Sequence, residues 1–93
     1  MDKLEHTLSK SISTFLKSNF DLTVDHFEFQ LTRKDFEGDL TLVLFPIIKQ
    51  TRTSPQVLGE KLGAYLIEHS DVVENFNVIS GFLNLSISDA HYL

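Results

Sequence analysis

Residues 74–88 read ENFNVISGFLNLSIS, and this stretch decides the fold. Apolar and polar residues alternate from 74 to 79 and again from 82 to 88, which is the pattern of strands with one buried face. Between the two runs stands Ser80-Gly81, a signal for a two-residue turn, in which Gly accepts a positive φ without steric cost. The stretch therefore predicts an antiparallel β-hairpin.

The register of this hairpin follows from the position of the turn. If Ser80 and Gly81 form the turn, the side chains sort into a dry face and a wet face. The predicted pairs are Val78 with Leu83 and Phe76 with Leu85 on the dry face, and Ile79 with Phe82 and Asn77 with Asn84 on the wet face.

Two further stretches predict strands. Residues 24–32 alternate, so they predict a strand with one face toward the core and one toward water. Residues 40–45, LTLVLF, form a nearly continuous apolar run before Pro46, which favours a short strand buried on both faces, although a buried helical turn also fits. The polar segments 33–39 and 49–53 are expected to be loops. In the first of these strands, Phe27, Phe29 and Leu31 are expected to face the core, and His26, Glu28 and Gln30 to face water.

Two stretches carry apolar residues at helical spacing. The first runs from Asp2, a candidate N-cap, to about Asn19. The second begins at Ser54-Pro55, where Ser caps free backbone N–H groups and Pro lacks an N–H that would be unpaired anyway, and runs to about His69. The predicted fold class is α+β, a small antiparallel sheet of about four strands with two main helices packed on one face.

Composition and charge limit the classes of protein to which this chain can belong. The 93 residues form a single domain, 1–93, with 42% hydrophobic and 23% charged residues. The absence of Cys fits a reducing cytoplasm, and no apolar run approaches the roughly 20 residues of a membrane span. The net charge of −5 argues against a stand-alone nucleic-acid binder, but not against a domain that contacts a few nucleotides while a larger body holds the phosphates. Residues 88–93 look like the first turn of a helix that stops abruptly, so we expect the chain to be a piece of something larger.

Neither a catalytic site nor a metal site is expected. The four His are scattered, and none has a second His or a carboxylate at a spacing that would place both toward a metal. The Ser residues lack a nucleophile-elbow context, and the isolated Gly38 and Gly81 do not make a phosphate loop. Glu37 and Asp39 are better explained as a solvated turn than as a carboxylate pair.

Phe82 is out of place in the last strand, because its face continues with the polar residues Asn84 and Ser86. An exposed aromatic ring can stack on an unpaired base for about 1–3 kcal/mol, and an amide beside it can read the edge of that base. The alternative is that Phe82 packs across the hairpin on Ile79 or under a neighbouring loop. Spacing alone favours this packing.

Three short motifs in fixed order resemble a known family. The chain is similar to the N-terminal domain of arginyl-tRNA synthetases over nearly its whole length, although Ile79-Ser80 stands where most bacterial members have Gly-Pro. The motifs are Gly38-Asp39-Leu40-Thr41, then Ser54-Pro55 opening a helix, then Gly81-Phe82-Leu83-Asn84 in the hairpin.

The resemblance implies a module that contacts the D-loop at the outer corner of tRNA(Arg) and helps to position it for ATP-dependent arginylation. Phe82 would stack on an unpaired nucleotide, and Asn84 would hydrogen-bond its edge, with Gly81 beside them; this reverses the preference for simple packing. Basic residues available to meet phosphates are Arg33, Lys34, Lys49 and Arg52.

The resemblance also implies what this chain lacks. The class I nucleotide-binding signature is absent, so the catalytic and anticodon-binding domains of the parent arginine–tRNA ligase, with its Mg-bound ATP, would lie beyond Leu93. The domain itself would need no cofactor. Its partners would be tRNA(Arg) and the catalytic body of the same cytoplasmic synthetase, without DNA or membrane. The alternative function is that of an acidic protein-interaction domain that uses the wet face of the sheet or the exposed hairpin.

Overall fold

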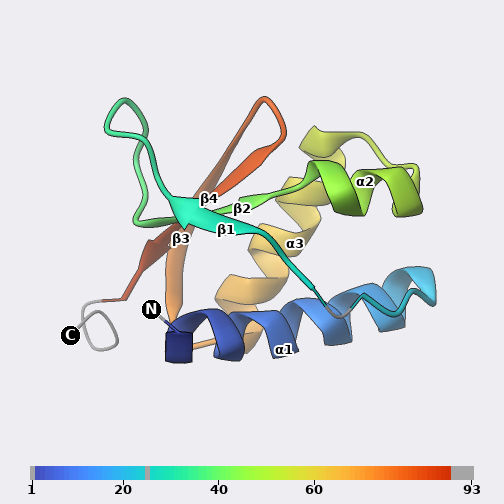
Figure 1. Ribbon diagram of the computed structural model, residues 1–93. Coiled ribbons are helices and arrows are strands. Elements are labelled where there is room, and N and C mark those ends of the chain that lie inside the picture. Colours follow the sequence, from blue (N-terminus) through green and yellow to red (C-terminus); the bar gives the residue numbers. More distant parts are fainter. Residues whose placement is uncertain (1, 25, 89–93) are drawn as a thin grey trace.

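A computed structural model describes residues 2–24 and 26–88, which form one four-stranded antiparallel sheet with three helices. The sheet has the strand order β1-β2-β4-β3 (Figure 1). This confirms the α+β class and the four strands. The elements are α1 (Asp2–Phe20), β1 (Phe29–Leu31), β2 (Leu40–Val43), α2 (Phe45–Thr51), α3 (Pro55–His69), β3 (Val73–Ile79) and β4 (Phe82–Ile87).

The hairpin of β3 and β4 forms with the predicted register. Ser80 has a φ of 48° and Gly81 a φ of 88°, so both turn residues adopt the positive φ of a type I′ turn. The only irregularity in this pairing lies between Val73 and Asn75, far from the turn. All four predicted pairs are present: Val78 with Leu83, Phe76 with Leu85, Ile79 with Phe82, and Asn77 with Asn84.

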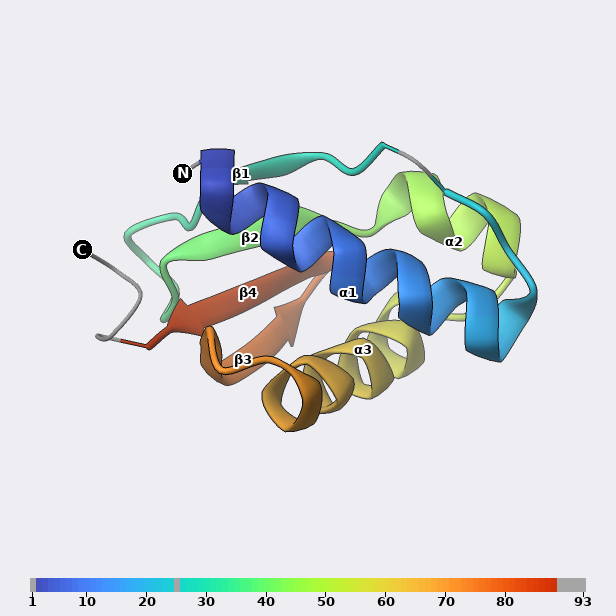
Figure 2. The same ribbon diagram turned by 90° about the horizontal axis from the view of Figure 1, so that it is seen from below.

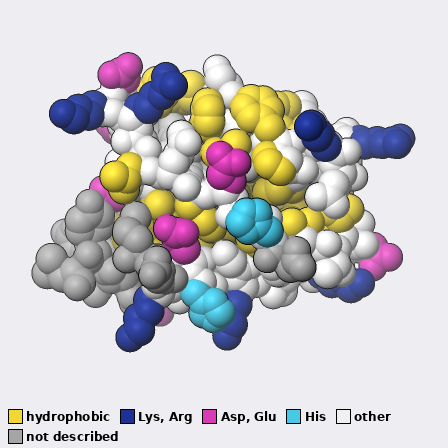
Figure 3. Space-filling model, in the orientation of Figure 1, with side chains coloured by type: hydrophobic (Ala, Val, Ile, Leu, Met, Phe, Trp, Pro, Cys, Tyr) yellow, Lys and Arg dark blue, Asp and Glu magenta, His cyan; other side chains and the backbone are white. Residues whose placement is uncertain are grey.

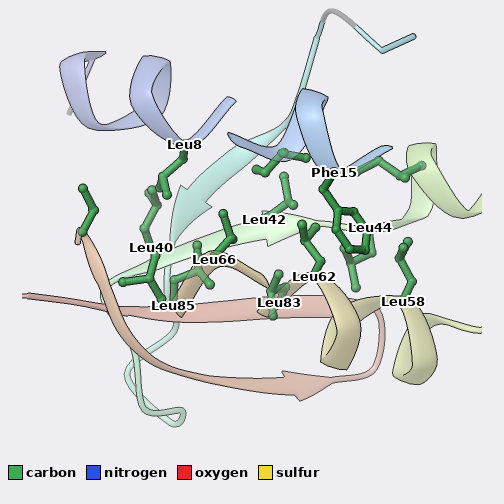
Figure 4. Packing of buried hydrophobic residues seen from close by; sticks show 14 of the residues in the cluster. Leu8, Phe15, Leu40, Leu42, Leu44, Leu58, Leu62, Leu66, Leu83 and Leu85 are labelled. Carbon is green, nitrogen blue, oxygen red and sulfur yellow. The ribbon is translucent and has the colours of Figure 1, made fainter. Parts of the chain in front are cut away.

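The core lies between one face of the sheet and the two long helices. Figure 2 shows α1 and α3 side by side across that face, which confirms the predicted helical layer. Alternate residues of β2 and β4 point toward the helices, and Leu, Ile and Phe side chains of α1 and α3 meet them (Figure 4). Fully buried members of this core are Leu8, Ile12, Leu16, Leu40, Leu42, Leu58, Leu62, Leu66, Leu83 and Leu85.

Two glycines of α3 let this helix approach β3 closely. A Cβ atom on Gly59 would lie 2.7 Å from the Val78 side chain, and one on Gly63 would lie 2.5 Å from the Phe76 ring. Real Cβ atoms do not approach other atoms so closely, so these positions accept only Gly at this separation. The small residues therefore fix the distance between α3 and the strand that leads into the hairpin turn.

The strand predicted over 24–32 is shorter than expected. Only Phe29–Leu31 pairs with β2. The segment before it is bonded to α1 instead, where Ser13 Oγ donates a hydrogen bond to Val24 O (3.2 Å). Phe27 and Phe29 pack against the core as predicted. Leu31 is 72% exposed, so its predicted burial is wrong, because it lies on an edge strand at a point that neither long helix covers.

The segment after β2 also differs from the prediction. Residues 40–43 form a strand buried on both faces, as expected. Phe45–Thr51, however, is the helix α2, with Pro46 in its first turn, where a missing N–H costs no helical hydrogen bond. The predicted loop over 49–53 is therefore wrong up to Thr51, and Arg52 ends the helix with a left-handed φ of 57°.

The second predicted helix is confirmed at its start. Ser54 caps α3, since its Oγ accepts a hydrogen bond from Val57 N (3.2 Å), and Pro55 is the first residue of the helix. The helix turn predicted at the end of the chain falls on 89–93, outside the described residues. No helix of the described part of the chain is long and apolar enough to cross a lipid bilayer.

Candidate nucleic-acid interface

A chain of hydrogen bonds crosses the outer face of the sheet, opposite α1 and α3. Asn77 Nδ2 donates to Glu37 O (2.7 Å), and Asn84 Nδ2 donates to Asn77 Oδ1 (2.9 Å). Thr41 Oγ1 donates to Asn84 Oδ1 (2.6 Å) and lies 2.8 Å from Thr32 Oγ1. Because Thr41 has one hydroxyl hydrogen and uses it on Asn84, Thr32 must be the donor in the last bond. We call these four side chains, Thr32, Thr41, Asn84 and Asn77, the polar ladder.

The polar ladder is buried at its centre, although its residues lie on the face predicted to be wet. Asn84 is 1% exposed and Thr41 is 2% exposed. The predicted exposure of Asn84 is therefore wrong. The connection between β1 and β2 lies over this face and covers it, with Glu37 O held by Asn77 and Gly38 against Asn84. Both the oxygen and the nitrogen of the Asn84 amide are occupied within the protein.

The Gly-Asp motif of this connection anchors it to β4. A Cβ on Gly38 would lie 3.1 Å from Thr32 Oγ1 and 3.2 Å from Asn84 Cβ, so the backbone approaches the polar ladder closely here. Asp39 N donates to Leu85 O (2.7 Å), and Asp39 Oδ2 accepts from Ile87 N (2.8 Å). The expectation of a solvated turn fails for Asp39, whose carboxylate accepts from a β4 N–H beyond Leu85, where the pairing of β4 with β2 ends.

Phe82 begins β4 at the hairpin turn, where it is partly exposed. It pairs with Ile79 across the hairpin, and its ring also meets the Phe45 ring edge-to-face, with centroids 5.9 Å apart and an interplanar angle of 87°. The start of α2 is tied to the turn by a bond from Leu44 N to Gly81 O (3.0 Å). The turn and α2 thus form one continuous surface, a contact that the sequence did not predict.

The four basic residues singled out in the sequence lie on either side of the turn. Arg33 and Lys34 are exposed on the β1–β2 connection, whereas Lys49 and Arg52 are exposed at the end of α2. Figure 1 shows the connection, the turn and α2 along the side of the molecule opposite α1. Figure 3 shows Lys and Arg side chains at both upper corners of this view and hydrophobic side chains between them. Within 2–24 and 26–88, none of the four forms an ion pair.

The remaining surface offers no alternative catalytic centre in the described residues. They contain no group of three His, Cys, Asp or Glu side chains that could hold a metal ion. An open groove runs between α1 and the segment that follows it, lined largely by Ser, Thr and Lys side chains of α1. None of the predicted site residues lines this groove. The polar ladder, Phe45 and Asp39 are the features that sequence reasoning missed. The Thr and Asn residues at outward positions of β2, β3 and β4 were the available signal for the polar ladder.

Comparison with known proteins shows the family of this chain. A family model described as the arginyl tRNA synthetase N terminal domain matches residues 2–87. The arginine–tRNA ligase of Flavobacterium psychrophilum is 44% identical over 100 residues, covering 97% of this chain and 17% of that protein. The arginine–tRNA ligase of Bacteroides thetaiotaomicron is 40% identical over 93 residues, covering 98% of this chain and 16% of that protein.

The solved structure of Thermus thermophilus arginyl-tRNA synthetase contains a similar fold, with a TM-score of 0.69 and 25% sequence identity over 89% of this chain and 14% of that chain. The chain thus spans about a sixth of the length of its curated relatives. It belongs to the family of arginyl-tRNA synthetase N-terminal domains.

Proposed function

We propose that this domain contacts the D-loop at the outer corner of tRNA(Arg) and helps to position the tRNA for arginylation by the synthetase that carries it. The observation that carries the proposal is the hairpin turn. It presents the partly exposed ring of Phe82 beside Gly81, between two groups of exposed basic side chains. Aromatic rings stack on unpaired bases, and Lys and Arg meet the phosphates on either side.

The basic residues have a defined part in this proposal. Arg33 and Lys34 approach the RNA backbone from the β1–β2 connection, and Lys49 and Arg52 approach it from α2. Because the chain carries a net charge of −5, these groups provide local attraction on an acidic body. The domain would therefore act together with the catalytic body and would not hold the tRNA alone.

Asn84 takes an indirect part in this proposal. A direct contact with a base edge would require its bonds to Thr41 and Asn77 to be exchanged, with Asn84 leaving a buried position. We propose instead that Asn84 is a positioning residue. Its amide donates a hydrogen bond to Asn77. The Asn77 amide in turn donates one to the β1–β2 connection, which carries Arg33 and Lys34.

The rest of the reaction belongs to the parent protein in this proposal. The relatives are named arginine–tRNA ligases. The parent of this domain would use Mg-bound ATP to join arginine to its tRNA. The ATP and arginine sites would lie in the catalytic body, which would be the second partner of this domain in the cytoplasm. The domain contributes affinity and orientation for tRNA, and no chemical step.

The test is aminoacylation by the full-length synthetase that carries this domain, with Phe82→Ala. Loss of a stacked base costs about 1–3 kcal/mol, so the KM for tRNA should rise about 5-fold to 150-fold. The KM values for ATP and arginine should not change, because those sites lie elsewhere. Ile67→Ala removes an apolar side chain that is 40% exposed on α3, and it should leave all three KM values unchanged.

An unchanged tRNA KM in the Phe82 variant would contradict this proposal. The domain would then be better explained as an acidic protein-interaction module that uses the same exposed hairpin.

A further inference from the structure

Phe45 is the large aromatic residue that the fold leaves most open to solvent near the hairpin turn. Its side chain is 48% exposed, although it follows directly after the fully buried Leu44. An exposed Phe forgoes the burial that stabilises most such rings, by about 1.5–3 kcal/mol. The ring is also held in place and does not project freely into solvent.

Two contacts hold the Phe45 ring. The atom at its tip, Cζ, lies over Gly81, where an added Cβ would be only 2.6 Å away. The same ring meets Phe82 edge-to-face. Since Leu44 N bonds to Gly81 O, the backbone that carries Phe45 cannot move away from the turn without breaking a hydrogen bond.

The same side of α2 also carries positive charge. Lys49 follows Phe45 at i+4, a spacing that places both residues on one face of α2, and the exposed Arg52 follows at the end of the helix. Lys49 lies in the last turn of α2 and Arg52 at its C-cap. An exposed aromatic ring with two exposed cations further along the same segment suits the base and the phosphates of a nucleotide.

We propose that Phe45, whose ring meets Phe82 edge-to-face, provides a second stacking face of the RNA site beside Phe82, and that Lys49 and Arg52 bind the phosphates that flank the stacked nucleotide. This inference rests on the proposed function and assigns part of it to α2. The ligand is an unpaired nucleotide of an RNA loop. Phe45 accepts its base without regard to sequence, because every base has a face that can stack.

Charge favours RNA over a protein partner for this surface. A hydrophobic peptide would need an apolar surface, whereas Phe45 is followed by the exposed cations Lys49 and Arg52. An RNA loop supplies both an apolar base and anionic phosphates. Binding of an acidic peptide that depends on Phe45 while tRNA binding does not would contradict the proposal.

The experiment compares Phe45→Leu with Phe45→His in the full-length synthetase that carries this domain. Leu keeps apolar volume over Gly81 but has no π face, whereas His keeps a planar aromatic ring and adds no atom beyond the tip that lies over Gly81. We expect Phe45→Leu to weaken tRNA(Arg) binding about 5-fold to 150-fold and Phe45→His to bind within about 2-fold of the parent. Ile67→Ala, the control for loss of an exposed apolar side chain, should bind like the parent.

A spectroscopic readout separates stacking from a merely structural role. The probe is tRNA(Arg) with 2-aminopurine at one unpaired D-loop position at a time. Binding of the parent enzyme and of the Phe45→His variant should change the fluorescence of one such position, and the Phe45→Leu variant should abolish that change at saturating enzyme. If Phe45→Leu binds and reports like the parent while Phe82→Ala fails, Phe45 is excluded and the proposed function stands. If neither variant affects tRNA, the proposed function itself fails.

Discussion

At the scale of single residues, substitution of Asn84 is expected to affect both the stability of the domain and its binding of tRNA. Its side chain is 1% exposed, and both ends of its amide bond to buried or partly buried partners. A buried polar group with all its bonds made contributes modestly, but removing it leaves its partners unpaired, which costs about 1–3 kcal/mol for each group. The residue is therefore sensitive to substitution whether or not it touches RNA.

Asn84→Ala should lower the free energy of unfolding of this chain by about 2–3 kcal/mol, measured by urea denaturation, because two hydrogen bonds are lost and Thr41 keeps a buried hydroxyl. Gln30→Ala, on the exposed edge strand, should change it by less than about 0.5 kcal/mol. If Asn84 acts by positioning, Asn77→Ala should weaken tRNA binding by the full-length synthetase as much as Asn84→Ala does. Normal tRNA binding by Asn77→Ala alone would favour a direct contact by Asn84.

The sequence pattern correctly predicted that Phe82 lies outside the core. It did not predict this for Phe45. Phe82 stands at an odd position on a polar face, a signal that lies within its own hairpin. Phe45 reads as the end of an apolar strand, because five apolar residues out of six precede Pro46 in positions 40–45. Its exposure depends on α2 starting at that residue, with the hairpin turn beneath the ring.

At the scale of elements, the contact of α3 with β3 is set by small residues. Gly63 lies against the Phe76 ring, and Gly59 lies against Val78. In an exposed helix, replacing Gly by Ala stabilises by about 1 kcal/mol through helix propensity. At Gly63 the added methyl group must displace α3 or the Phe76 ring, and overpacking of this kind costs about 1–3 kcal/mol or more.

Gly63→Ala should therefore destabilise the chain by about 1–2 kcal/mol in urea denaturation, despite the gain in helix propensity. The matched control is Ala64→Gly, one residue further along on the exposed side of α3, which should cost about 1 kcal/mol through propensity alone. A Gly63→Ala variant more stable than the parent would show that the helix and strand separate without loss of packing.

The element boundaries that were predicted wrongly have a common cause. Strand β1 begins later than predicted because only three of its residues pair with β2, and the segment before them is bonded to α1. Helix α2 replaces a predicted loop because Pro46 fits a first helical turn as well as it fits the end of a strand. In both cases local preference allowed two structures, and neighbouring elements selected one.

At the scale of the whole molecule, three segments distant in the sequence form one side of the domain: the β1–β2 connection, the hairpin turn and α2 (Figure 1). If Arg33 and Lys34 meet phosphates, their loss should reduce the salt dependence of tRNA binding by the full-length synthetase. Each phosphate contact contributes a slope of about −0.7 for single strands in a plot of log K against log salt concentration.

Combined Arg33→Ala and Lys34→Ala substitutions should therefore make that slope less negative by about 1.4, measured by filter binding over a range of salt concentrations. Lys61→Ala, which removes an exposed cation from α3, should leave the slope unchanged. An unchanged slope in the double variant would show that the β1–β2 connection does not contact the RNA phosphates. The proposed RNA surface would then consist of the turn and α2 alone.

The sequence by itself determined the hairpin, its register and its turn, the buried faces of β2 and β4, and the Ser54 start of α3. These features depend on side-chain alternation, turn chemistry and capping within a few residues of each position. The three short sequence motifs also indicated the family to which the chain belongs. Only the tertiary structure decided that Asn84 is buried and that Phe45 is exposed. The bond between Asn84 and Thr41 joins residues 43 positions apart, and the Phe45 ring lies on a turn formed by a different element. Such contacts depend on how distant segments pack, which no local pattern specifies.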